Sequence, residues 1–336
     1  MAPDAQTAYA VLTRSCGMVD RSARGKLALT GEEAAGLLSG QVTNEVEALA
    51  DGHGCYAALL TNKGKMLGDL RVLRIGGEAP ELHLDCERTA LQALFDQLRR
   101  AAIGWKAELH KRTVQEALLS LVGPEAGATL AAAAGGSGSL GAGDRSEGRR
   151  LTTFPEEEHA HVAVEVGGAA VRAITTDVGI DVLCAAEDAE RLREALLRAG
   201  AEPVDEATAE VLRVATGRPR YGVDLDDGVI PQEAGLNERA VSVTKGCYVG
   251  QETVARMHWR GKPNRHLRGV RLAGEVGEGA ALTSAEGKRV GAVSSVGEHP
   301  ELGWIALALI RREVEPGAVV AVEGGGDATV VALPFS

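Results

Sequence analysis

Short apolar runs with strand-like spacing alternate with single runs of helical spacing along the first hundred residues. Residues 26–29 show strand-like alternation, and the TGEE sequence at residues 30–33 has the spacing of a capping box that opens a helix. The apolar runs at 54–60 and 66–75 flank a TNKG turn, which predicts a β-hairpin. The run 90–102 has apolar residues at helical spacing. This alternation predicts α+β modules.

The second half of the chain repeats this order and then changes character. Strands are expected near 161–166 and 171–174, followed by a helix over about 187–199 and another that begins after Asp205, a candidate N-cap. From Leu267 onward, short apolar runs separated by glycines have the spacing of a small β-barrel. The Gly/Ser-rich stretch at 135–148 has no periodicity and predicts a surface loop or linker.

Size and composition limit the classes of protein. A chain of 336 residues with 45% hydrophobic and 25% charged residues is expected to fold into two or three domains. Aromatic residues are only 3%, and 36 basic against 47 acidic residues give a net charge of −11, which argues against nucleic acid as a partner. The chain shows neither a membrane-spanning run nor a signal-peptide pattern, so we expect no membrane contact and a cytoplasmic location.

The cysteine pattern limits metal chemistry. The five cysteines are far apart and form no CxxC pair, so the sequence holds neither a disulfide framework nor a self-contained zinc or iron–sulfur site. Any cysteine chemistry therefore depends on one thiol. The best candidate is Cys247 in KGCYVGQE at residues 245–252, where Lys245 supplies a nearby cation that favours the thiolate and two glycines relieve crowding. The alternative is an inert buried thiol in a turn.

The KGCYVGQE string, followed by Arg256, resembles the signature of the YgfZ-type folate-binding proteins, relatives of the glycine cleavage T-protein (aminomethyltransferase). Further stretches carry the resemblance over nearly the whole chain, among them YAALLTNKGKMLGDLRV, RVATGRPRYGVDL and PQEAGL. The resemblance implies a GcvT-like α+β fold in which two related folate-binding domains and a C-terminal β-barrel form a ring around a central channel. The expected domains are 1–50 with 110–215, 51–109 with 216–262, and 263–336.

The resemblance also implies a folate site that binds tetrahydrofolate or a derivative. The segment KGKMLGD places Asp69 where the T-protein has the carboxylate beside the reactive folate nitrogen, and a carboxylate there can orient the pterin and stabilise developing charge. Asp177 loosely matches the T-protein glutamate that binds the pterin edge, and Arg213 matches its arginine. The alternatives are a salt bridge of Asp69 near Arg71 and a helix-terminal role for Arg213.

The remaining motif residues complete the predicted site. Lys245, Tyr248 and Arg256 are expected to contribute to cofactor binding, and the basic run 260–268 is expected to contact a polyglutamylated folate tail, unless it is only a solvated linker. Cys247 and Asp69 are the candidate catalytic residues. Cys247 is also a candidate iron ligand, but only with a partner that supplies further ligands, because clusters use about four.

Three functions follow from the resemblance. The first is a tetrahydrofolate-binding factor that supports assembly or repair of iron–sulfur proteins through Cys247, with an iron–sulfur carrier protein as partner and a shared iron–sulfur cluster. The second is a folate-dependent one-carbon transferase of the aminomethyltransferase or demethylase type, centred on Asp69. The third is a folate-binding regulator without turnover. The sequence does not separate them.

Overall fold

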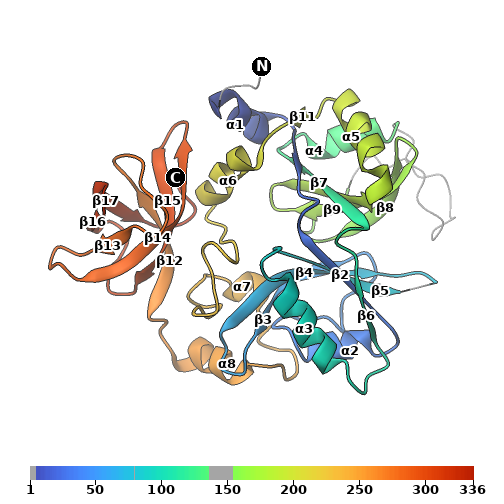
Figure 1. Ribbon diagram of the computed structural model, residues 1–336, viewed down its shortest axis with the longest axis horizontal. Coiled ribbons are helices and arrows are strands. Elements are labelled where there is room, and N and C mark those ends of the chain that lie inside the picture. Colours follow the sequence, from blue (N-terminus) through green and yellow to red (C-terminus); the bar gives the residue numbers. More distant parts are fainter. Residues whose placement is uncertain (1–4, 79, 136–153) are drawn as a thin grey trace.

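The computed structural model describes residues 5–78, 80–135 and 154–336. Two β-sheets and a closed β-barrel are arranged around a common centre, with α6 (Glu206–Ala215) between the six-stranded sheet and the barrel (Figure 1). This confirms the predicted α+β fold class with its C-terminal barrel. The Gly/Ser-rich stretch predicted at 135–148 lies, from residue 136 onward, outside the described residues. In the part of the chain that the structure describes, none of the helices combines the length and apolarity that crossing a membrane requires.

The six-stranded sheet has the order β11-β1-β7-β10-β9-β8. Its strands are β1 (Gly17–Asp20), β7 (Glu116–Val122), β8 (His161–Val166), β9 (Ala169–Thr176), β10 (Gly179–Ala185) and β11 (Glu202–Pro203). Two helices pack on it and bury a core of small aliphatic side chains: α4 (Ala126–Ala133) and α5 (Ala189–Arg198), the latter preceded by the short 3-10 helix η1 (Ala186–Asp188). The N-terminal helix α1 (Ala5–Arg14) packs instead against α6.

The five-stranded sheet has the order β3-β4-β5-β2-β6. Its strands are β2 (Gly25–Thr30), β3 (Gly54–Leu60), β4 (Met66–Ile75), β5 (Glu81–Cys86) and β6 (Glu108–Lys111). The leucine-rich sides of α2 (Ala34–Ser39) and α3 (Leu91–Ala101) cover one face. A second cluster beside β3 and β4 includes residues of α7 (Asn237–Ala240) and α8 (Gln251–Arg260). Late segments of the chain therefore complete an early sheet.

The barrel closes in the order β12-β15-β14-β13-β16-β17. Its strands are β12 (Arg265–Arg271), β13 (Ala281–Thr283), β14 (Arg289–His299), β15 (Gly303–Arg311), β16 (Val319–Val322) and β17 (Gly326–Val331). Alternating valine, leucine, isoleucine and alanine side chains fill its interior, as the period of two requires. Val214 of α6 packs against Leu267, Ile305 and Leu307 outside that interior, which attaches the barrel to the rest of the ring.

Most local predictions are confirmed, and one is wrong. The hairpin of β3 and β4 forms, and Asp205 caps α6 by accepting a hydrogen bond from the Thr208 backbone N–H at 2.8 Å. The capping box at 30–33 does not form: the Glu33 carboxylate accepts the Lys106 backbone N–H at 2.6 Å, and the Thr30 hydroxyl contacts His110. Thr30, at the end of β2, and Glu33, at the start of α2, therefore both bond to the segment 106–110 and not to each other's backbone.

The division of the chain into domains stays a prediction. Strand β2 comes from the segment 1–50, which that division assigns to the first domain, yet it hydrogen-bonds to β5 and β6 of the five-stranded sheet. Since β1 pairs in the other sheet, the chain crosses from one sheet to the other between Asp20 and Gly25.

Candidate functional site

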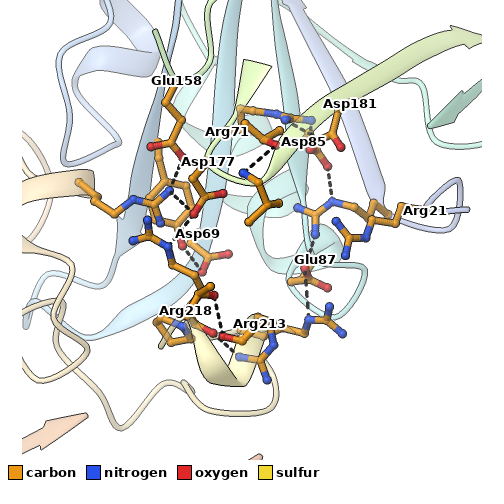
Figure 2. Close-up of a pocket in the computed structure, with 18 of the residues that line it drawn as sticks. Arg21, Asp69, Arg71, Asp85, Glu87, Glu158, Asp177, Asp181, Arg213 and Arg218 are labelled. Atoms are coloured by element: carbon orange, nitrogen blue, oxygen red, sulfur yellow. Dashed lines mark hydrogen bonds and ion pairs between the residues drawn. The ribbon is translucent and has the colours of Figure 1, made fainter. Parts of the chain in front are cut away.

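A cavity of about 220 Å³ lies where the two sheets meet α6 and the segment that follows it (Figure 2). Its wall combines residues of β4, the β9–β10 turn, β10, α6 and residues 218–221. Asp69, Asp177 and Arg213, three residues that the sequence places on separate segments, all line it. The fold therefore brings together the three side chains that the family resemblance assigns to one ligand.

The cavity wall is densely charged. Seven arginines and six carboxylates line it, so the wall carries about one formal positive charge in a chain of net charge −11. The arginines are Arg21, Arg24, Arg71, Arg213, Arg218, Arg220 and Arg239, and the acids are Asp69, Asp85, Glu87, Glu158, Asp177 and Asp181. Figure 2 labels the six acids together with Arg21, Arg71, Arg213 and Arg218, and it shows these side chains around one space. Such a wall suits a polar ligand that carries negative charge.

Arg71 joins the two sheets beneath this cavity. Its guanidinium donates to Asp85 of β5 and to Asp181 of β10, each at 2.7 Å, and all three side chains are buried. Arg24 donates to the second oxygen of Asp85 at 2.8 Å. Burial alone would raise the pKa of Asp85, but the guanidinium groups of Arg24 and Arg71 outweigh it and lower that pKa to about 2. Asp85 is therefore a permanently ionised structural anion.

Asp69 has the opposite environment. Its side chain, on β4, is only 5% exposed and accepts a hydrogen bond from the Tyr56 hydroxyl at 2.6 Å. Among the described residues it is the one cavity carboxylate without an ion pair to an arginine. Burial raises the pKa of Asp69 to about 6, even though the bond from Tyr56 lowers it. A buried acid with such a pKa can hold or release a proton near neutral pH.

Asp177 and Arg213 line the cavity, and each forms an ion pair with a neighbouring residue. Asp177, in the β9–β10 turn, accepts from Arg218 at 2.7 Å and lies 3.8 Å from a guanidinium nitrogen of Arg239. Arg213, in the last turn of α6, donates to Asp224 at 2.7 Å and to Ser295 of the barrel at 2.6 Å. Arg213 thus forms an ion pair with Asp224, and its hydrogen bond to Ser295 ties α6 to the barrel.

The predicted contacts within the KGCYVGQE motif lie outside the cavity wall. The Lys245 ammonium is buried and donates to the carbonyl oxygens of Ser39, Val42 and Asn44 at 2.7–2.8 Å. Its charge therefore fixes a loop of the five-stranded sheet, because three carbonyl groups use all three of its protons. Tyr248 is packed in an apolar cluster beneath that ammonium.

Two other predicted contacts are also placed elsewhere. Arg256 is exposed on α8 and is not among the cavity residues. In the basic run 260–268, Arg265 pairs with Glu233 at 2.9 Å and Arg268 lies 3.7 Å from Glu315, so neither is directed to the cavity. Arg265 and Arg268 are thus paired with acids that lie far from them in sequence, which the spacing of the basic run could not reveal.

Cys247 is the exposed cysteine of the chain, and it lies outside the cavity wall. The other four thiols are buried or half-buried, and burial raises the pKa of Cys55 to about 12 and that of Cys184 to about 11. The described residues include no group of three or more His, Cys, Asp or Glu side chains arranged to hold a metal ion. That an iron–sulfur partner supplies the further ligands at Cys247 stays a prediction.

Several cavity residues are not predicted as site residues from the sequence. Tyr56, Arg24 and Arg71 belong to this group, together with Asp85 and Asp181. The available signal was a charged residue inside an apolar strand: Arg71 and Asp85 occupy buried strand positions, where an unpaired charge is too costly to persist. Each such residue implies a buried partner, although the sequence does not say which one.

Comparison with known proteins shows the family to which this chain belongs. Residues 3–245 match the family model described as the GCVT N-terminal domain, which covers well over half of the chain. The chain belongs to the GCVT family. An aminomethyltransferase from Rubrobacter xylanophilus is 31% identical over 97% of this chain and 84% of that protein, and one from Thermus thermophilus is 29% identical over 97% and 89%. A chloroplastic relative from Arabidopsis thaliana is 28% identical over 88% of this chain, which spans 65% of that relative.

The GCVT fold extends over the entire chain. The crystal structure of the glycine cleavage system aminomethyltransferase T from Bartonella henselae superimposes with a TM-score of 0.83 and covers 99% of this chain and 89% of that one. At 23% sequence identity this similarity establishes the fold alone. The barrel, which lies beyond the matched residues 3–245, therefore belongs to the same GCVT-like architecture.

Proposed function

We propose that this protein binds tetrahydrofolate or a derivative in the cavity, against Asp69. The observation that carries the proposal is the state of Asp69: it is a buried carboxylate on the cavity wall with no arginine partner among the described residues. Burying an acid without a cation is costly, so such a group is typical of a binding or catalytic site. The relatives named aminomethyltransferase support the same ligand class.

The cavity residues fit such a ligand. A pterin ring presents N–H and amine donors. Tyr56 bonds to one carboxylate oxygen of Asp69, so the other oxygen can accept a hydrogen bond from the pterin. The surrounding arginines favour a ligand with carboxylates. When bound, a reduced folate supplies a nitrogen that carries a one-carbon unit. Asp69 can orient that nitrogen and hold a proton beside it, while Tyr56 keeps its carboxylate in place.

The finer function that we propose is a folate-binding factor that supports assembly or repair of iron–sulfur proteins. Cys247 is the accessible thiol, and its absence from the cavity wall leaves it free for a partner protein while folate is bound. One thiol cannot hold a cluster alone, so an iron–sulfur carrier protein would supply the other ligands of a shared cluster. The cysteine and the folate site then act as two separate surfaces of one protein.

A one-carbon transferase is the second candidate. The relatives named aminomethyltransferase favour it, and so does the pKa of Asp69 near 6, which suits proton transfer. This function needs Asp69 and the cavity but gives no role to the exposed thiol. The two candidates therefore differ in whether Cys247 matters.

The test uses three variants in two assays. Calorimetry with tetrahydrofolate under anaerobic conditions should show Asp69→Ala binding at least about 10-fold more weakly, while Cys247→Ser binds as the wild type does. Rescue of iron–sulfur enzyme activity in a strain lacking the protein should fail with Cys247→Ser and succeed with Cys55→Ser, the matched control. Absence of wild-type binding would contradict the folate site, and full rescue by Cys247→Ser would favour the transferase.

A further inference from the structure

His159 lines the cavity in a backbone conformation that histidine does not favour. Its φ is 71°, and every other described residue with φ in the left-handed region is a glycine. A side chain in that region crowds its own backbone, so glycine would take up this conformation at a lower energetic cost. Conformational strain of this kind persists where the side chain has a use, often at a ligand site.

The contacts of His159 with the described residues do not explain why this position carries an imidazole ring. Its Nδ1 is buried and has no hydrogen-bond partner among the residues that the structure describes, and its Nε2 lies 3.6 Å from a carboxylate oxygen of Glu158, which exceeds hydrogen-bond length. Only the backbone of His159 is anchored, by donation from its N–H to the Thr175 carbonyl at 2.8 Å. A glycine would keep that backbone bond. The imidazole is therefore not required by the fold that surrounds it.

The ring is uncharged at physiological pH. Burial lowers the pKa of His159 to about 3, and the nearby guanidinium groups of Arg71 and Arg239 lower it further against the opposing effect of Asp177 and Asp181. It thus adds a flat, neutral surface to a wall made mostly of charged groups. Flat side chains are scarce here, since aromatic residues are only 3% of the chain.

We infer that His159 is a specificity residue of the cavity, whose imidazole packs against the planar heterocycle of the bound ligand. The inference rests on the proposed folate site and adds to it the part of the ligand that this wall recognises. Tyr56 and Tyr221, which also line the cavity, are the other side chains with flat rings at that wall. The backbone strain at His159 then has a function, because a glycine at this position would leave no side chain there to contact the ligand.

His161 offers a matched control two residues further along. It is buried, whereas His159 is partly buried, and burial lowers the pKa of His161 to about 4, so it too is neutral. Unlike His159, it lies in β8, hydrogen-bonds to Arg172 at 2.9 Å and is not among the cavity residues. A change at His161 therefore tests the loss of a neutral buried imidazole without a loss of cavity wall.

The experiment compares His159→Gly, His159→Ala and His161→Ala with the wild type. Affinity for tetrahydrofolate and for 6-methyltetrahydropterin is measured by anaerobic calorimetry, and the midpoint of thermal unfolding is recorded. Both variants at 159 should bind both ligands about 10-fold more weakly, because the ring contact is lost. The Gly variant should unfold about 2 °C or more above the Ala variant, because only Gly relieves the backbone. His161→Ala should bind both ligands within about twofold of the wild type.

The outcomes separate the two proposals. Wild-type binding together with unchanged affinity in His159→Gly would overturn the role of His159 and leave the folate site intact. An equal loss of affinity in His161→Ala would also overturn it, because the effect would then be structural. Failure of the wild type to bind tetrahydrofolate would overturn the proposed function and this inference with it.

Discussion

The cavity and the segment around Cys247 are built in opposite ways. In the cavity, charged side chains from segments far apart in sequence meet, and ion pairs hold nearly every one of them. In the 245–250 segment, residues close in sequence differ in solvent exposure: Lys245 and Tyr248 are buried, whereas Cys247 is exposed. Residues that are adjacent in this motif therefore have different environments, whereas the cavity brings together residues that are distant in sequence.

This difference has an energetic side. The buried ions of the cavity other than Asp69 each have a charged partner, so removing one member of such a pair is costly. The exposed thiol has no such dependence. The comparison therefore predicts large effects on stability from cavity residues and almost none from Cys247.

The largest effect is expected at the ion pair between Arg213 and Asp224. The Asp224 side chain is fully buried and that of Arg213 is 11% exposed, so Asp224→Ala should lower the free energy of unfolding by about 3 kcal/mol or more. Chemical denaturation measures it. Asp177→Ala is the control, since its partner Arg218 is 38% exposed and the loss should stay below about 1 kcal/mol. Equal losses would remove the distinction between buried and exposed pairs.

A smaller effect, of opposite sign, is expected at Asp69. Its folded pKa of about 6 lies above its ordinary value of 3.8, so the stability it contributes is present below pH 3.8 and is lost as pH rises through 6. Asp69→Asn removes that loss and should stabilise the protein by about 3 kcal/mol at pH 8 but by little at pH 3.5. Unfolding curves across this range measure it.

Asp85 serves as the counterpart of Asp69 in that experiment. Its pKa of about 2 lies below the ordinary value, so its stabilisation is present above pH 3.8 and is lost as pH falls through 2. Asp85→Asn should therefore destabilise the protein at pH 8, where Asp69→Asn stabilises it. If both variants shift stability in the same direction, the contrast between a paired and an unpaired cavity carboxylate is wrong.

The smallest effect is expected at Cys247. Cys247→Ser should change the free energy of unfolding by less than about 0.5 kcal/mol, because the side chain is exposed. In native wild-type protein we expect a disulfide reagent such as DTNB to label one thiol rapidly, and Cys247→Ser to abolish that phase. Rapid labelling that survives the substitution would show that a buried thiol is more accessible than the structure indicates.

The sequence predicts some of these features well because their causes are local. Apolar periodicity located the hairpin 54–75, and the Asp205 cap depends only on neighbouring residues. The sequence predicts that Lys245 acts beside Cys247 and that Glu33 caps its own helix. In the structure Lys245 bonds to carbonyl groups between Ser39 and Asn44, and Glu33 bonds to Lys106. Neither contact could be predicted, because these partners are distant in sequence. Resemblance to a family brought Asp69, Asp177 and Arg213 together, which periodicity alone could not do.

The anchoring of Lys245 also bears on how the chain is made. Its ammonium and the backbone bonds Ser242 to Thr43 and Val249 to Gly40 tie residues 39–44 to partners about 200 residues later. A ribosome adding about 5–20 residues per second needs about 10–40 s for that stretch. During that time residues 39–44, beside the five-stranded sheet, lack these partners, so we expect this part of the nascent chain to reach its final structure only after residue 249 has emerged from the ribosome.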